Sequence, residues 1–231
     1  MTSEIKADKW SPASGTAGTI GDSGDTFTVP SGVTLDIASG ATADFTGATV
    51  TGLTDNNTWV LLQTTTLSST TGNVDFNNVF DSTYKNYVVI GSQIRGDSDS
   101  KILCRFGTGS TPTYDSTSNY HRVVAYVSSN GGDGIKNSTS DTAILVTPNT
   151  IDTSSGDASF IMYFPEPENT DRQLQVYFSG IEFDTNPAET QFHGGGRCDN
   201  IAAGTPVTSV RYTPNSGSGF DTGTFKLYGV K

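Results

Sequence analysis

The feature that most constrains this chain is a repeat of short apolar alternations between residues 24 and 53. The segment divides into four imperfect units, GDTFTVPSG, VTLDIASG, ATADFTG and ATVTGL, which are punctuated by glycine or other small residues. Apolar side chains recur at intervals of two, which predicts short strands with one apolar and one polar face. The positions assigned to the apolar face include Phe27, Val29, Val33, Leu35, Ile37, Phe45 and Val50.

These predicted strands need neighbours that the segment itself does not supply. Each unit carries only two or three small apolar side chains, and stacked repeats of this kind depend on adjacent units for their core. Copies of the same chain around a threefold axis would give every unit two equivalent neighbours. We therefore predict a homotrimer with a β-prism or triple β-helix stem over residues 21–57, and a monomeric solenoid is the alternative.

The pattern changes at Thr58 to longer and more aromatic strands. About ten such strands are expected between there and the C-terminus, separated by loops of Gly, Asn, Asp, Ser and Pro without helical spacing. This arrangement predicts an antiparallel β-sandwich. A jelly roll is the favoured topology, because ten strands exceed the usual immunoglobulin-like count. The whole chain is thus expected to be all-β, with an irregular arm over 1–20, the stem over 21–57 and a sandwich head over 58–231.

Composition excludes several classes of partner. The net charge is −11 and the 13 Lys and Arg residues are scattered, whereas a nucleic-acid surface needs a basic stripe. No run approaches the roughly 18 apolar residues that suggest a membrane span, and the N-terminus lacks a signal-peptide pattern. We expect no nucleic acid, no membrane insertion and no export by a leader of its own. Cys104 and Cys198 lack metal-ligand spacing and are expected to be free thiols.

Catalytic and metal-binding signals are weak. His121 and His193 are the only histidines. We interpret His193 and the three glycines after it as a bend or bulge, and the alternative is a backbone that approaches a ligand or another strand closely. Asp97, Asp99 and the NGGDG turn at 130–134 raise the possibility of calcium, but turn acids in water are the preferred interpretation. We predict no metal, no cofactor and no enzymatic activity.

Two long polar loops are the expected contact surface. GTGSTPTYDSTSN spans residues 107–119 and SSNGGDGIKNSTSD spans residues 128–141, and loops of this length are often functional. Aromatic faces beside such loops can stack on sugar rings while Asp and Asn bind hydroxyl groups. The alternative is that the tyrosines simply cover the edge of the sandwich. The candidate contact residues are Tyr114, Asp115, Asn119, Tyr120, Asn130 and Asp133.

Several segments share features with one group of proteins. Residues 3–32 combine an S-E-I-K start, a later proline and G-D-S-G-D-T before an apolar-Pro-x-Gly turn, and residues 223–231 read GTFKLYGVK. Trp59, FDSTYKNYVVI at 80–90 and GGGR at 194–197 also match. Together these segments resemble fibre and minor structural proteins of tailed bacteriophages, particularly marine phages.

The resemblance implies a virion protein that is assembled in the bacterial cytoplasm. Its arm would attach to other virion proteins through Ile5, Trp10 and Pro12, although Trp10 could instead fold back on the stem. The head would bind a glycan or another receptor on the host surface. The length of 231 residues is short for a long tail fibre, so a capsid decoration or head-fibre role without receptor binding is the main alternative.

An enzyme that depolymerises host glycans is a third hypothesis. Such enzymes use paired carboxylates. The sequence offers Glu166, Glu182 and several Asp residues, but no convincing pair.

Overall fold

The computed structural model describes residues 59–154 and 156–231. The predicted arm with Ile5, Trp10 and Pro12 and the predicted stem over 21–57 lie outside the described residues. Within the described part the fold is all-β with thirteen strands and no helix, so the all-β prediction is confirmed there. That part accordingly contains no helix able to span a membrane.

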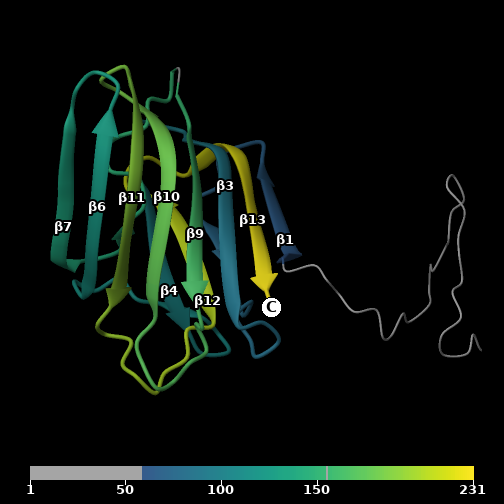
Figure 1. Ribbon diagram of the computed structural model, residues 1–231. Helices are drawn as coiled ribbons and strands as arrows, with labels where there is room; N and C mark the ends of the chain where they lie inside the picture. The colour runs from purple at the N-terminus through teal and green to yellow at the C-terminus, as the bar shows by residue number, and fades with distance from the viewer. Residues whose placement is uncertain (1–58, 155) are drawn as a thin grey trace, which may run out of the picture. The chain divides into compact units, whose positions relative to one another are not determined.

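Eight strands form the larger of two sheets, and every pairing in it is antiparallel (Figure 1). Their spatial order is β1 (Trp59–Leu67), β13 (Phe220–Val230), β3 (Asn86–Gly96), β9 (Ala158–Pro165), β10 (Gln175–Asp184), β11 (Ala188–Cys198), β6 (Tyr120–Ser128) and β7 (Asp133–Asp141). Strands β1 and β7 are therefore the two edges of this sheet.

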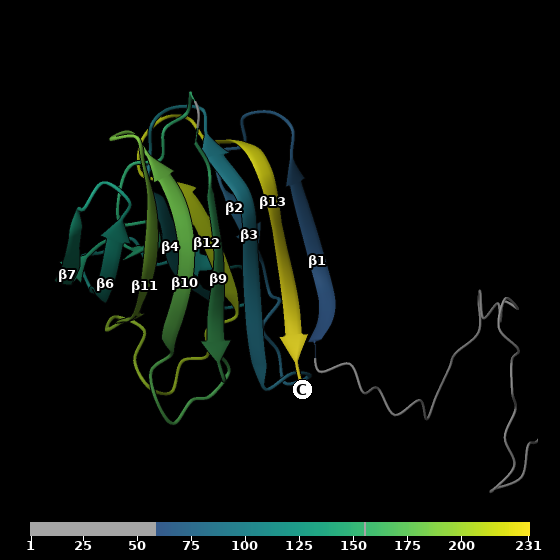
Figure 2. The ribbon, with the colours of Figure 1, turned by 45° about the horizontal axis from the view of Figure 1, so that its top comes forward.

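The smaller sheet lies behind the larger one, which is clearest in the turned view of Figure 2. Its order is β2 (Val74–Phe76), β12 (Ser209–Pro214), β4 (Ile102–Thr108) and β5 (Thr113–Tyr114), and β8 (Ile144–Leu145) also pairs with β4. The two antiparallel sheets form the predicted sandwich.

Alternation along the strands explains the core between the sheets. In β9, Phe160, Met162 and Phe164 are buried, whereas Ile161 and Tyr163 between them are only partly buried on the opposite face. This is the period of two that a pleated strand imposes. Cys104 and Cys198 are buried in the same core without a disulfide, as predicted.

The predicted loop 128–141 is wrong for most of its length. Only the turn at 129–132 is irregular, and β7 then pairs with β6 from Val127↔Asp133 to Tyr120↔Asp141. Strand β7 lies at the edge of the sheet, pairs only with β6 and is largely exposed to solvent. An edge strand of this kind does not need an apolar face, and DGIKNSTSD does not have one. Residues 142–147 contain only the two residues of β8 in strand conformation.

Candidate functional site

The two predicted contact loops lie at opposite ends of one strand. Loop 107–119 leads into Tyr120 at the start of β6, whereas the turn at 129–132 follows Ser128 at its end. At about 3.3 Å per residue, the nine residues of β6 separate these ends by roughly 25 Å. The loops therefore do not combine into a single contact surface on one chain.

Tyr120 is not available to a surface ligand, contrary to the sequence-based prediction. Its side chain is 0% exposed. The hydroxyl accepts a hydrogen bond from the Phe106 backbone N–H at 2.9 Å and donates to the Asp115 carbonyl at 3.2 Å. Tyr120 thus belongs to the core, which neither the contact-surface prediction nor the alternative of tyrosines at the sandwich edge anticipated.

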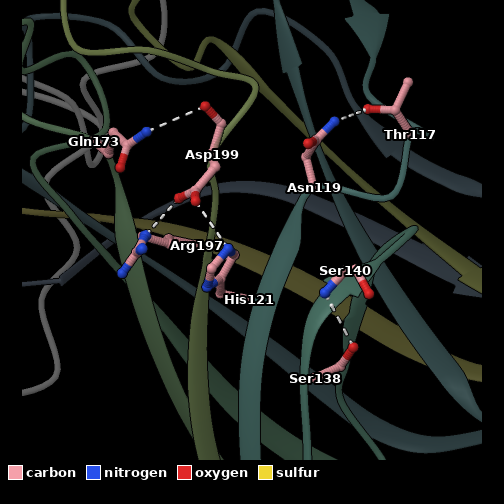
Figure 3. Close-up of polar contacts among 8 residues, drawn as sticks. All are labelled: Thr117, Asn119, His121, Ser138, Ser140, Gln173, Arg197 and Asp199. Carbon is pink, nitrogen blue, oxygen red and sulfur yellow. Dashed lines mark hydrogen bonds and ion pairs between the residues drawn. The ribbon is translucent and has the colours of Figure 1, made fainter.

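The other predicted residues of loop 107–119 are largely bonded to the protein itself. The Arg211 guanidinium lies 4.1 Å from the centre of the Tyr114 ring, and the Tyr114 hydroxyl donates to Asn77 Oδ1 at 2.6 Å. Desolvation raises the pKa of Tyr114 to about 12. The side-chain amide of Asn119 donates to Thr117 Oγ1 at 2.6 Å (Figure 3). These contacts order the loop.

Asp115 is likewise hydrogen-bonded to other residues of the protein. Its carboxylate accepts hydrogen bonds from Thr117 and Asn200. In the turn at 129–132, the Asn130 side chain also bonds to the protein. It accepts a hydrogen bond from the Gly132 backbone N–H and donates one to the Asn186 carbonyl. Asp133 is exposed as the first residue of β7.

The outer face of the larger sheet, which points away from the smaller sheet, carries an aromatic row that sequence analysis missed. Strand register places its members side by side, because paired residues on adjacent strands project to the same face. In order across the sheet, the residues of the row are Tyr228, Val88, Tyr163, Tyr177, Gly195 and Val123, and the three tyrosines are its aromatic members. Trp59 of β1 packs edge-on against Tyr163 at 6.3 Å between ring centres.

Tyr177 is the most exposed aromatic residue in this row. Its ring stacks on that of Tyr163 at 4.6 Å between centres and 9° between planes, and 53% of the residue is exposed. A glycine, Gly195, occupies the next place in the row. The Tyr177 ring is therefore supported by Tyr163 on one side and stands beside an open position on the other.

The glycine tract is a regular part of β11, so the predicted bend or bulge is wrong. Pairing with both β10 and β6 continues from Thr190 to Arg197 without a register shift. Gly194 and Gly196 face inward, where a Cβ at Gly194 would lie 2.8 Å from the Phe178 ring and one at Gly196 would overlap Ile144 Cδ1. Close packing thus requires these two glycines, and Gly195 leaves a depression on the outer face.

We call this depression the β11 groove, and it consists of two adjoining hollows. One is about 450 Å³ and is lined by Tyr163, Tyr177, Val123, Ala125, Phe178, Ser179, His193 and Gly194. The other is about 500 Å³, includes Val123 and Gly195, and reaches His121, Gln175 and Arg197 at the end of the strand. The groove therefore has an aromatic wall, a glycine floor and a polar end.

Asp199 organises the polar end. Its carboxylate accepts from Arg197 Nε at 2.6 Å and contacts His121 Nε2 at 2.8 Å, while its backbone carbonyl accepts from the Gln173 amide (Figure 3). The hydrogen bond from Arg197 holds the pKa of Asp199 below its usual value. Among the described residues, none accepts a hydrogen bond from the two terminal nitrogens of Arg197. Those donors remain available at the groove.

This combination of groups fits a sugar better than a metal. Stacked aromatic rings bind the apolar face of a pyranose, and a fixed guanidinium donates to hydroxyl or ring oxygens. In the described part of the chain, no group of three His, Cys, Asp or Glu residues is placed to hold a metal. Asp97 and Asp99 instead accept hydrogen bonds from the loops at Ser218 and Thr153.

A sequence signal for the missed residues does exist. In SFIMYF, Tyr163 lies in the opposite phase to Phe160, Met162 and Phe164, which places an aromatic ring on the wet face of the strand. Tyr177 has the same relation to Val176 and Phe178 in β10. Large aromatic residues in the solvent-facing phase of two strands could therefore have indicated this surface.

Comparison with protein-family models, curated proteins and solved structures finds no match to this chain.

Proposed function

We propose that this chain is a homotrimeric virion fibre protein whose C-terminal sandwich binds a glycan on the host surface. The observation that carries glycan binding is the β11 groove, with the half-exposed Tyr177 ring beside Gly195 and the polar end at Arg197. The virion assignment is supported by the resemblance of residues 3–32 and 223–231 to phage fibre proteins. The arm would bind other virion proteins through Ile5, Trp10 and Pro12.

We further propose that the head is an elaborated jelly roll. Eight strands support this topology, since β1-β13-β3-β9 and β2-β12-β4-β8 are the two four-stranded paths that such a fold requires. Two insertions account for the rest: β5 to β7 lie between β4 and β8 in the chain, and β10 and β11 lie between β9 and β12. The β11 groove would then be built largely on the insertions.

Trimerisation gives weak sites a physical advantage. A shallow groove makes few contacts, so one copy is expected to bind a sugar weakly. Three copies on one stem act together, and the effective concentration of the second and third contacts raises the overall affinity. The proposed stem over residues 21–57 would supply this multivalency.

The direct test is glycan binding by the full chain with a substitution at Tyr177. We expect the purified protein to bind polysaccharide from the host envelope and Tyr177→Ala to weaken binding at least tenfold, because the stacking surface is lost. Ile181→Ala is the matched control, since Ile181 projects from the same face of β10 and is 43% exposed. Equal binding by Tyr177→Ala and the control would exclude the groove as the glycan site.

A capsid decoration role is the second candidate, because the resemblance is to fibre and minor structural proteins, and some such proteins decorate the phage head. Cryo-electron microscopy of virions distinguishes the two roles. Trimers on the tail or collar support the adhesin. Trimers on the capsid, together with normal adsorption of particles that lack the protein, support decoration.

A further inference from the structure

A second groove is lined by residues of the smaller sheet and by residues of β6 and β7, the last two strands at one edge of the larger sheet. Figures 1 and 2 show these two strands at that edge. Its volume is about 530 Å³. Leu103 of β4 and Leu145 of β8 contribute from the smaller sheet, and Arg122 and Lys136 contribute from the larger one. We call it the overhang groove. It shares Arg122 and Asn137 with the polar hollow of the β11 groove, whose aromatic wall lies on the outer face.

Three cationic side chains line the overhang groove. Lys101 precedes β4, Arg122 lies on β6 and Lys136 lies on β7. Asp141 is the single carboxylate among the lining residues. This local excess of positive charge is notable in a chain whose net charge is −11.

The described residues supply only some of the hydrogen-bond acceptors and counter-charges that these three cations can use. Arg122 Nε pairs with Asp141 at 2.5 Å, but Arg122 Nη1 is buried without a hydrogen-bond partner. Lys136 Nζ donates to two neutral oxygens, the Pro148 carbonyl at 2.5 Å and Asn149 Oδ1 at 2.9 Å. The Lys101 ammonium makes no hydrogen bond or ion pair with any residue in the described ranges.

Two further acids face Lys136 from β10. Glu182 is 1% exposed, and burial raises its pKa to about 8, so it is largely protonated at neutral pH. The Asp184 carboxylate accepts hydrogen bonds from Asn149, Asn186 and Thr190. Burial, followed by the charge of Lys101, lowers the pKa of Lys136. The like charges therefore repel one another, and an anion between them would relieve the repulsion.

We propose that the overhang groove binds a sulfate or phosphate group between Lys101, Lys136 and Arg122. Lys ammoniums act as point charges toward such an oxyanion, and an Arg guanidinium adds directed donors. The volume exceeds what one inorganic ion needs, so the group can be carried on a saccharide. The same chemistry is offered by free inorganic anions and by sulfated or phosphorylated glycans.

The test is an amide NMR titration of the full chain with sodium sulfate, with chloride adjusted to keep the ionic strength constant. We expect saturable shifts at residues 101–103 and 135–137. Lys101→Gln should weaken the apparent affinity at least fivefold, because the Lys101 ammonium has no hydrogen bond or ion pair with the described residues that would compete with the anion. Lys226→Gln is the matched control, since it removes the same charge from an exposed site on β13.

Shifts that do not saturate, or equal affinity for Lys101→Gln and Lys226→Gln, would overturn the proposal. A parallel titration with glucose 6-sulfate identifies the source of the anion. Tighter binding than inorganic sulfate indicates a sulfated saccharide, and equal or weaker binding indicates a free anion. Because Tyr177→Ala should leave the sulfate titration unchanged, failure of the β11 groove and failure of this site remain distinguishable.

Discussion

The rings of Tyr163 and Tyr177 stack nearly parallel, 4.6 Å apart, on the outer face of the larger sheet. The two residues are directly paired across β9 and β10, so the strand spacing sets the ring spacing. Tyr163 restricts the orientations that the exposed Tyr177 ring can adopt. A sugar that stacks on Tyr177 therefore meets a wall that is already ordered, which lowers the entropy cost of binding.

We predict that Tyr163→Ala weakens glycan binding three- to tenfold, because Tyr177 loses its support although it remains present. Tyr163→Phe retains the ring and should bind like the wild type. Affinity measured on immobilised glycan checks both variants. If Tyr163→Phe were as weak as Tyr163→Ala, the hydroxyl rather than the stack would be the important feature.

The inward-facing glycines of β11 are predicted to determine stability. A Cβ at Gly196 would overlap Ile144 Cδ1 and the His121 carbonyl oxygen. Gly196→Ala should therefore lower the free energy of unfolding by about 1–3 kcal/mol, as overpacking generally does. Gly72→Ala is the control, because the nearest atom to its added Cβ lies at 3.5 Å.

Chemical denaturation of the two glycine variants measures this difference. An unchanged midpoint for Gly196→Ala would mean that β11 and β8 separate easily. That result would contradict the close packing of Gly196 against Ile144.

Glu182 is predicted to make stability depend on pH. Burial raises the pKa of Glu182 from 4.5 to about 8 in the folded chain. The fold thus favours the protonated acid, and this contribution is fully present below pH 4.5 and is lost as pH rises through about 8. At about 1.4 kcal/mol per pKa unit, the loss across this window amounts to several kcal/mol.

Glu182→Gln should remove most of this pH dependence. The amide is neutral at every pH, and its oxygen can still accept from the Asn149 backbone N–H, as Glu182 Oε1 does at 2.7 Å. Unfolding free energies at pH 5 and pH 8.5 provide the measurement. The wild type should lose more stability than the variant between these values, and parallel losses would refute the role of Glu182.

Structural features that leave a local pattern in the sequence can be predicted from it, and features that depend on distant segments cannot. Alternation of buried and exposed residues, as in β9 and β10, is a local signal, so the all-β class was predicted correctly for the described residues. Strand β7 was missed because an edge strand with polar residues on both faces carries no alternating signal. The predicted contact residues were assigned to loops because loops commonly carry function, whereas the groove proposed as the glycan site lies on the face of a sheet.

The amino-acid sequence contains the phase of each well-patterned strand, and this phase places Tyr163 and Tyr177 on the side opposite the core. The pairing of strands in the folded chain stacks these rings and places Gly195 and Val123 beside them across the sheet. It also brought Lys101, Arg122 and Lys136 to one groove from three separate elements. The physical reason is that strand order and register arise from contacts between distant segments. A period of two within one strand does not encode which strand lies beside it.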